Sequence, residues 1–240
     1  MINYLNVLIA CEESQRVCVA FRKRGHNAFS CDIQEPSGEH PEWHIHGDAL
    51  KVLNPDKYKG IEFQTMDGVS YCITKWDLII AHPPCTYLSN AGACRLYPKK
   101  GIINQERYEK GLQAKEFFMK FINADCEHIA VENPVPSKIY NLPNYSQIIQ
   151  PYEYGHPYTK KTCLWLKNLP NLKPTNIVKP KGMWVNGNSS IWKNQAITNE
   201  VTGKSKDPKV LAKTFEGIAE AIAEQWSEYI LACNTTQNVL

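Results

Sequence analysis

The sequence predicts an α/β domain with a mostly parallel, doubly wound central sheet, and two observations carry this prediction. The first 32 residues have the pattern of a strand, a helix and a second strand, the unit that opens such sheets. Residues 76–81 and 129–131 are almost continuous apolar runs, as in parallel strands covered on both faces. With 240 residues and 43% hydrophobic composition, residues 1–240 are expected to form a single domain with one core.

The opening unit begins with a short apolar strand at residues 7–10. Residues 14–24 follow with apolar side chains at helical spacing, and Gly25 is expected to end that helix. Residues 27–31 then predict a second strand that ends at Asp32. A carboxylate is therefore expected at the carboxyl end of the second strand.

The rest of the chain predicts further elements of the same fold. A helix over residues 105–123 is expected between the two apolar strands, and proline-rich loops follow Pro134. Residues 162–166 are a last strand candidate. Residues 169–206 are rich in Pro, Asn, Lys and Gly, which indicates a short irregular segment or hairpin, and residues 209–229 are expected to form one closing helix.

Composition narrows the class of protein. The net charge of +3 permits nucleic-acid binding without indicating it. Nine cysteines without paired C-x-x-C spacing argue against a disulfide framework or a zinc knuckle and favour reduced thiols. The first apolar run lacks a basic leader, and no run approaches the roughly 20 residues of a membrane span. We therefore expect a cytoplasmic protein without a membrane partner.

Cys85 is the sharpest candidate for chemistry. It follows the apolar strand at residues 76–81 through the rigid pair Pro83-Pro84. In open α/β sheets, ligands bind at the carboxyl ends of the strands, so a cysteine at this place is a candidate nucleophile. The alternative is a structural thiol after a turn.

Glu132 follows the other apolar strand, and one helix fits between it and Cys85. The two strands can therefore be neighbours whose ends face one pocket. A thiolate that adds to carbon 6 of a pyrimidine, with an acid that protonates ring nitrogen 3, would activate carbon 5 towards methylation. The alternative is a glutamate that caps a helix or pairs with a lysine.

These motifs resemble those of the DNA cytosine-5 methyltransferase family, in particular its compact phage-type members. Pro84-Cys85 matches the family's Pro-Cys loop, and Glu132-Asn133-Pro134 matches its Glu-Asn-Val triplet. Residues 154–162 resemble the segment whose basic residue supports the catalytic loop, and residues 213–226 resemble the closing helix.

The resemblance implies a Rossmann-like class I methyltransferase fold and the methylation of cytosine, with S-adenosyl-L-methionine as cofactor. It implies Cys85 as nucleophile, Glu132 as acid and Asn133 as the residue that positions Glu132. Lys160 or Lys161 would be the basic residue. DNA is the implied substrate, and the target base would have to leave the stack.

The resemblance also implies a cofactor site at the ends of the first strands. Asp32 would take the ribose hydroxyls, and the segment around Asp48 resembles the one that contacts adenine, although a turn or cap role is the alternative for both aspartates. The family's first loop is glycine-rich, whereas residues 10–14 contain no glycine. The expected cofactor-binding residues are Cys11, Glu12, Glu13, Asp32, Asp48, Pro83 and Pro84.

The sequence departs from the family in lacking a full target-recognition domain. Only residues 169–206 are available, and their expected contacts are Lys173, Lys179, Lys181, Trp184 and Trp192. We therefore expect a short sequence preference, or RNA or a free cytosine nucleotide as substrate. A solvated surface loop, and a non-catalytic relic that binds nucleic acid or protein, remain alternatives.

A cluster of histidines and acids near residue 40 could suggest a metal site. No cysteine or second cluster completes a coordination set, so no metal is expected and polar pocket or surface roles are favoured. The cluster comprises Glu39, His40, Glu42, His44 and His46.

Overall fold

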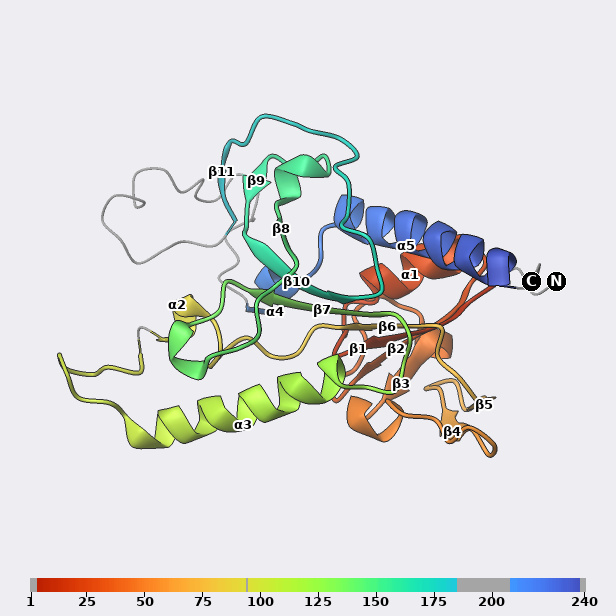
Figure 1. Ribbon diagram of the computed structural model, residues 1–240, viewed down its shortest axis with the longest axis horizontal. Coiled ribbons are helices and arrows are strands. Elements are labelled where there is room, and N and C mark those ends of the chain that lie inside the picture. The colour runs from red at the N-terminus through yellow and green to blue at the C-terminus, as the bar shows by residue number, and fades with distance from the viewer. Residues whose placement is uncertain (1–3, 94, 185–207, 238–240) are drawn as a thin grey trace.

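The computed structural model describes residues 4–93, 95–184 and 208–237, and a seven-stranded sheet forms its centre (Figure 1). In order across the sheet, the strands are β3 (His44–His46), β2 (Asn27–Asp32), β1 (Asn6–Ala10), β6 (Leu78–Ala81), β7 (Ile129–Pro134), β10 (Thr162–Lys167) and β8 (Gln147–Ile149).

The sheet is mostly parallel. Strands β3, β2, β1, β6 and β7 pair in parallel, and β10 is antiparallel to both β7 and β8. The first five strands follow the doubly wound order, and the strand order reverses at β1, next to β6. The predicted Rossmann-like α/β fold is therefore confirmed, and ligands are expected beyond the carboxyl ends of β1 and β6.

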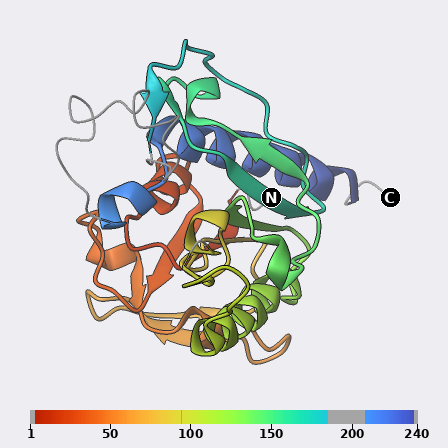
Figure 2. The same ribbon diagram turned by 90° about the vertical axis from the view of Figure 1, so that its left-hand side faces the viewer.

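Helices cover both faces of the sheet (Figures 1 and 2). Helices α1 (Arg16–Lys23) and α5 (Glu216–Gln237) lie side by side on one face, and α3 (Gln105–Ile122) lies on the other. Because successive residues of a strand point to opposite faces, Val7 and Ile9 of β1 pack in the cluster under α1 and α5. Leu8 packs on the α3 side.

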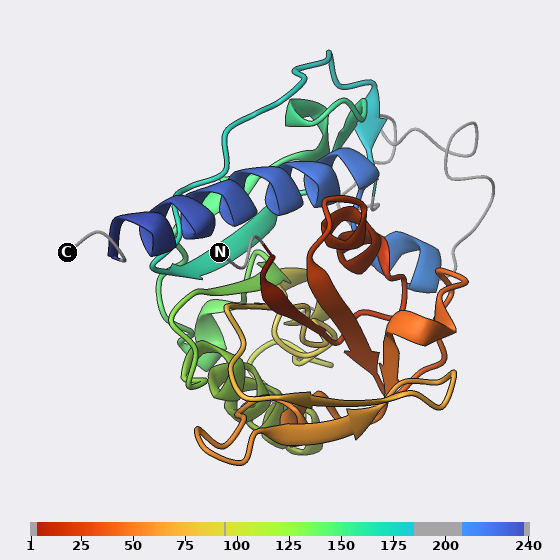
Figure 3. The same cartoon turned by 90° about the vertical axis from the view of Figure 1, so that its right-hand side faces the viewer.

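Smaller elements decorate this core. Figure 3 shows the β-hairpin of β4 (Ile61–Gln64) and β5 (Ser70–Ile73) on the same side of the sheet as α3. The remaining strands and helices are β9 (Tyr158–Thr159), β11 (Gly182–Met183), α2 (Asn90–Ala93), α4 (Pro208–Ala212) and the 3-10 helices η1 (Pro41–Trp43), η2 (Ala49–Lys51), η3 (Lys138–Tyr140) and η4 (Pro151–Glu153).

The expected single helix over residues 209–229 is wrong. The chain forms two helices there, because the backbone leaves the helix at residues 213–215 and the Thr214 carbonyl accepts a hydrogen bond from Arg16 Nη1 at 2.7 Å. Strand β8 was not expected in the proline-rich stretch. In the segment 169–206, β11 pairs in parallel with β9 instead of forming a hairpin, and residues 185–206 lie outside the described residues.

Over the described part of the chain, no helix is both long enough and apolar enough to cross a membrane.

Candidate active site

The candidate active site lies where β6 ends beside β7. These neighbouring strands run in parallel with Ala81 opposite Val131. His82, the first residue after β6, therefore lies beside Glu132, which is still part of β7 and pairs with Leu164 of β10. The chain then passes through Pro83, which is buried, and the exposed Pro84 to Cys85, which is partly buried. The two predicted groups, the thiol and the carboxylate, therefore emerge at one edge of the sheet.

Backbone hydrogen bonds fix the loop that carries Cys85. Ser89 N donates to the Cys85 carbonyl at 3.1 Å and closes a turn. Ser137 N donates to the Leu88 carbonyl at 2.7 Å, which ties this loop to the segment that follows Glu132. The two chain segments of the candidate site therefore form one unit.

Asn133 supports the same loop from β7. Its side chain is buried, and Nδ2 donates to the Pro83 carbonyl at 3.1 Å. The buried Oδ1 has no hydrogen-bond partner among the described residues. Asn133 therefore holds the backbone before Cys85, whereas the sequence led us to expect it to position Glu132.

Arg107 on α3 clamps the far side of the loop. Its Nη2 donates to the Thr86 and Gly92 carbonyls, each at 3.1 Å, and its guanidinium lies 4.9 Å from the centre of the Tyr87 ring. A side chain at Gly92 would collide with the Thr86 carbonyl. The turn after Cys85 is therefore closed around a glycine and a guanidinium.

His82 and Glu132 form an ion pair. His82 Nδ1 lies 3.2 Å from Glu132 Oε2, and the two side chains are only 12% and 24% exposed. Burial lowers the pKa of His82, but the hydrogen bond and charge of Glu132 outweigh it, so the net pKa is raised. Burial raises the pKa of Glu132, but the hydrogen bond and charge of His82 outweigh it, so the net pKa is lowered. Both shifts favour an imidazolium beside a carboxylate.

Lys160 brings a second cation to this pair. Its Nζ donates to the Leu211 carbonyl at 3.0 Å, and it lies close enough to Glu132 and Cys85 for their charges to act on it. Burial nevertheless lowers the pKa of Lys160. Lys161 is exposed. Of the two predicted lysines, the structure brings Lys160 to the site.

The Cys85 thiol is held in its protonated form by this surrounding. Burial raises the pKa of Cys85, the Glu132 carboxylate raises it further, and Lys160 opposes both effects. A thiolate at Cys85 therefore requires additional positive charge nearby or the removal of the Glu132 charge.

The loop between β1 and α1 contains no glycine. It has two residues in a strained backbone conformation and one buried carboxylate. Cys11 and Gln15 have φ of 58° and 57°, in the left-handed region that glycine adopts most readily. Glu12 is 4% exposed and accepts hydrogen bonds from Val17 N at 2.7 Å and Cys18 N at 3.2 Å. The Glu12 side chain thus binds the first turn of α1, and it lies close enough to His82 for the two charges to act on each other.

Asp32 and Asp48 converge on this loop. The pKa of Cys11 is raised by burial and then by the charges of Asp32 and Asp48, so the three side chains are near one another. Asp32 Oδ1 accepts from Gln34 N at 2.8 Å, and Asp48 Oδ1 accepts from Leu50 N at 3.0 Å. Each carboxylate keeps a second oxygen without a hydrogen bond among the described residues. This set of acceptors beside the switch point fits the hydroxyls of a nucleoside.

Glu13 is the remaining member of the first loop. Its carbonyl accepts from Ser37 N at 2.8 Å, which holds the loop after β2 against the loop after β1. Its side chain is partly exposed.

The predicted recognition residues divide into two groups. Lys173, Lys179 and Lys181 are exposed. Trp184 is partly buried and packs against the core, with ring centres 5.0 Å from Tyr158 and 4.8 Å from Phe215. Trp192 lies outside the described residues.

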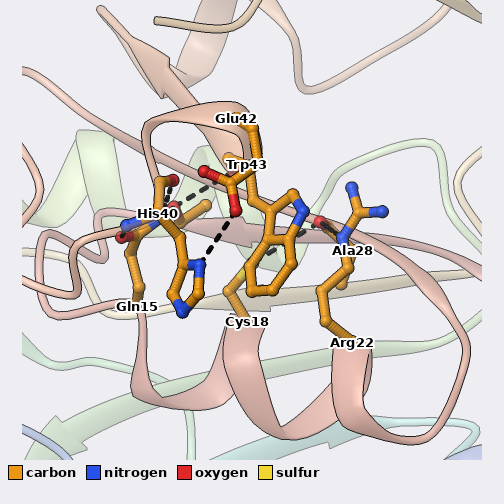
Figure 4. Close-up of polar contacts among 8 residues, drawn as sticks. Gln15, Cys18, Arg22, Ala28, His40, Glu42 and Trp43 are labelled. Carbon is orange, nitrogen blue, oxygen red and sulfur yellow. Dashed lines mark hydrogen bonds and ion pairs between the residues drawn. The ribbon is translucent and has the colours of Figure 1, made fainter. Parts of the chain in front are cut away.

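The histidine cluster is explained by structural contacts. Figure 4 shows the Trp43 ring between the His40 ring and the Arg22 side chain. His40 Nδ1 lies 2.9 Å from Glu42 Oε1, and Gln15 Nε2 donates to the His40 carbonyl at 2.8 Å. The cluster therefore shapes the segment after β2.

The other two histidines of the cluster also have protein partners. His44 is fully buried between Ser30 Oγ and the Gln34 carbonyl, and His46 Nε2 donates to the Ile33 carbonyl at 2.9 Å.

Sequence reasoning missed His82 and Arg107. His82 stands directly before the Pro-Pro-Cys motif at a strand end, and this position was the available signal. Arg107 lies in a helix whose sequence gives no indication of its partners.

No protein-family model matches the chain, and a search of curated proteins finds no relative. Among solved structures, the S. pombe Dnmt2 methyltransferase is similar with 14% identity and a TM-score of 0.35, over 70% of this chain and 50% of that one. The Entamoeba histolytica methyltransferase EhMeth is similar with 15% identity and a TM-score of 0.36, over 78% of this chain and 61% of that one. The chain therefore spans about half to three fifths of these structures, and its function does not follow from either likeness.

Proposed function

We propose that this protein methylates cytosine at carbon 5, in DNA, with S-adenosyl-L-methionine as methyl donor. One observation supports the proposal above all others. The Cys85 thiol follows β6 and the Glu132 carboxylate stands on the neighbouring parallel strand β7 at the same edge of the sheet, with Lys160 close to both. A nucleophile, an acid–base group and a cation close to one another are what addition to a pyrimidine ring requires.

In this mechanism the Cys85 thiolate adds to carbon 6 of the ring, while Glu132 delivers a proton to ring nitrogen 3. Electron density would then move to carbon 5, which would take the methyl group. When bound, the donor would supply that group from a cationic sulfonium, whose charge would favour the Cys85 thiolate, and it would leave as a neutral thioether. A base would remove the proton from carbon 5 as the bond to Cys85 breaks, nitrogen 3 would give up its proton, and 5-methylcytosine would leave.

The residues of the chain have separate tasks. Asn133 holds the Pro83 carbonyl, so the backbone before Cys85 keeps its course. Lys160 offsets the negative charge of Glu132 and the thiolate. Asp32 and Asp48 would hold the nucleoside part of the donor, with Cys11, Glu12 and Glu13 contributing backbone and Pro83 and Pro84 forming the wall towards Cys85.

The proposed chemistry requires a cytosine ring, whether the ring belongs to DNA, RNA or a free nucleotide. The exposed lysines at 173, 179 and 181 support a nucleic-acid phosphate backbone. DNA is therefore the first substrate to test, and RNA and a free cytosine nucleotide are the matched alternatives.

Covalent trapping tests this function directly. In 5-fluorocytosine, carbon 5 carries no proton to remove after methyl transfer, so the adduct with Cys85 should persist through denaturation. The purified protein, the methyl donor and fluorinated DNA, RNA or nucleotide are incubated and the mass of the denatured protein is measured. An increase equal to the methylated substrate, located on Cys85, is expected with DNA.

Two variants sharpen the trapping experiment. Cys85→Ala should form no adduct, whereas Cys72→Ala, which removes an exposed cysteine on the hairpin, should react like the intact protein. Glu132→Gln should slow adduct formation by roughly two to four orders of magnitude, the usual scale for losing one general acid. The absence of an adduct with every fluorinated substrate, or equal trapping by Cys85→Ala, would rule out the cytosine-5 mechanism.

A further inference from the structure

His82 is a buried titratable group for which the mechanism above gives no task. It follows β6 directly, its Nδ1 lies 3.2 Å from Glu132 Oε2, and its side chain is 12% exposed. Its Nε2 is buried without a hydrogen-bond partner among the described residues. Glu132 is therefore the group through which His82 can act.

Charged groups face His82 from three elements. Glu132 approaches from β7, Glu12 from the loop after β1, and Lys160 from the segment between β9 and β10. The two carboxylates favour an imidazolium and Lys160 opposes it. A small cavity of about 20 Å³ adjoins this group and is lined by His82, Glu132, Lys160 and Thr214 among others.

The proposed acid step needs a proton that Glu132 does not hold at neutral pH. The hydrogen bond and charge of His82 bring the pKa of Glu132 below its ordinary value in spite of burial. A carboxylate cannot protonate ring nitrogen 3. His82 Nδ1 lies within hydrogen-bond distance of Glu132 Oε2, at 3.2 Å, and can supply that proton.

We propose that His82 is a positioning residue that holds the Glu132 carboxylate in place and supplies the proton that Glu132 passes to the base. This inference rests on the proposed function. As the Cys85 thiolate adds to carbon 6, the proton moves from His82 Nδ1 to Glu132, and Glu132 gives a proton to ring nitrogen 3. Neutral His82 and the Glu132 carboxylate remain, and nitrogen 3 returns the proton by the same route when the product leaves.

The pH profile of trapping separates proton supply from mere packing. In the intact protein, the trapping rate should rise with pH as Cys85 ionises and fall again as His82 loses its proton. His82→Gln keeps an N–H donor for Glu132 but carries no ionisable proton. In this variant the falling limb should move to lower pH, and trapping near pH 7.5 should drop by ~10- to 100-fold, less than for loss of the acid itself.

A matched control exists outside the site. His40 and Glu42 form a second His–Glu pair, with Nδ1 and Oε1 2.9 Å apart, so His40→Gln should leave the pH profile unchanged. His82→Ala removes both the donor and the proton and should trap more slowly than His82→Gln at every pH. Circular dichroism of each variant checks that the fold is retained.

Nuclear magnetic resonance of labelled histidine gives a readout without substrate. The His82 signal, assigned from its absence in His82→Gln, should titrate above the ordinary histidine value of about 6.5 and move to lower pH in Glu132→Gln. Trapping by the intact protein together with an unshifted profile in His82→Gln would overturn this inference alone. No trapping by the intact protein would overturn the proposed function and this inference with it.

Discussion

Glu12 shows at the scale of one residue how a loop without glycine can close. Its carboxylate accepts the free N–H groups of Val17 and Cys18 at the start of α1, where the helix dipole favours negative charge. A helix end of this kind is otherwise a binding site for a ligand anion. Because Glu12 occupies this helix end, the carboxylate of the proposed methyl donor would need partners elsewhere in the site.

Asp32 carries the prediction for cofactor affinity. Asp32→Asn keeps an oxygen for the hydrogen bond from Gln34 N but loses the charge and the second acceptor oxygen. We expect the variant to bind S-adenosyl-L-methionine more weakly by about 1 to 2 kcal/mol, the scale of charge-assisted hydrogen bonds to ribose. Isothermal titration calorimetry measures this difference.

Asp56→Asn is the control for Asp32→Asn. Asp56 also accepts backbone N–H groups within a turn, from Tyr58 and Lys59, and lies in the loop before the hairpin. The Asp56→Asn variant should bind S-adenosyl-L-methionine with the same affinity as the intact protein. Equal affinity of all three proteins would show that Asp32 does not touch the ribose.

Single residues differ in how far the sequence predicts them. Cys85 and Glu132 stand out because each follows an apolar run in the sequence, and the carboxyl ends of the strands are the reactive edge of this fold. His82 also ends a strand, but its partner Glu132 is fixed only by the pairing of β6 with β7. The choice of Lys160 over Lys161 depends on side-chain direction, which no sequence pattern encodes at the start of a strand.

At the scale of the element, Arg107 is predicted to fix the loop over residues 86–93. Arg107→Ala removes two hydrogen bonds to backbone carbonyls and the contact with the Tyr87 ring. Local opening of this loop should become easier by about 1 to 2 kcal/mol, which hydrogen exchange of its amides measures. Lys110→Ala, one turn later on α3, removes only an exposed ion pair with Glu106 and should leave exchange unchanged. Equal exchange in Arg107→Ala and the intact protein would contradict the clamp.

The edge formed by β2 and β3 should weaken in acid. His44 is fully buried, and burial lowers its pKa below the ordinary value of about 6.5. At pH values between the lowered pKa of His44 in the folded protein and its ordinary pKa in the unfolded chain, the unfolded chain binds more protons. The contribution of His44 to stability is therefore present above about pH 6.5 and is lost as the pH falls. In His44→Gln, the free energy of unfolding should therefore depend less on pH between 7 and 5.

Urea unfolding at several pH values measures this dependence. His46→Gln serves as the control, because His46 lies on the same strand but is exposed. A slope in His44→Gln as steep as that of the intact protein would show that other groups cause the acid sensitivity.

Strands and helices could be predicted from the sequence where their residues form an extended apolar or helical pattern. Strands β1, β2, β6 and β7 and helix α3 agree with the predicted ranges within a few residues. Strand β8 has three residues between prolines, and its pairing with β10 supplies what its own sequence does not indicate. The interruption between α4 and α5 likewise depends on a distant contact, from Arg16 to the Thr214 carbonyl.

At the scale of the whole molecule, the sheet separates two apolar clusters that both support the candidate site. The cluster under α1 and α5 reaches Ile80 and Ala130 on the strands that lead to His82 and Glu132. The opposite cluster contains Ile79 and Val131. Because both faces are packed, the strand ends are held from two sides, and the loops beyond them can be exposed without losing their position.

Helix α5 carries the last prediction, which concerns the stability of the whole fold. Trp226 is fully buried in the cluster under α1 and α5, and its Nε1 donates to the Pro170 carbonyl at 3.0 Å. Trp226→Ala should lower the free energy of unfolding by about 3 to 5 kcal/mol, because a large cavity replaces the ring. Trp226→Phe keeps most of the apolar contact and loses the hydrogen bond to the exposed Pro170, so a smaller loss of about 0.5 to 1.5 kcal/mol is expected.

Urea unfolding of the three proteins tests this order, with Glu220→Ala on the exposed side of α5 as the control. The control should lie within about 0.5 kcal/mol of the intact protein, as is usual for surface substitutions. Because α5 packs on α1 and α1 follows the first loop, the loss in Trp226→Ala should appear as one cooperative transition. A two-step transition, or a cost for Trp226→Ala no larger than for Glu220→Ala, would show that α5 is not an integral part of the folded core.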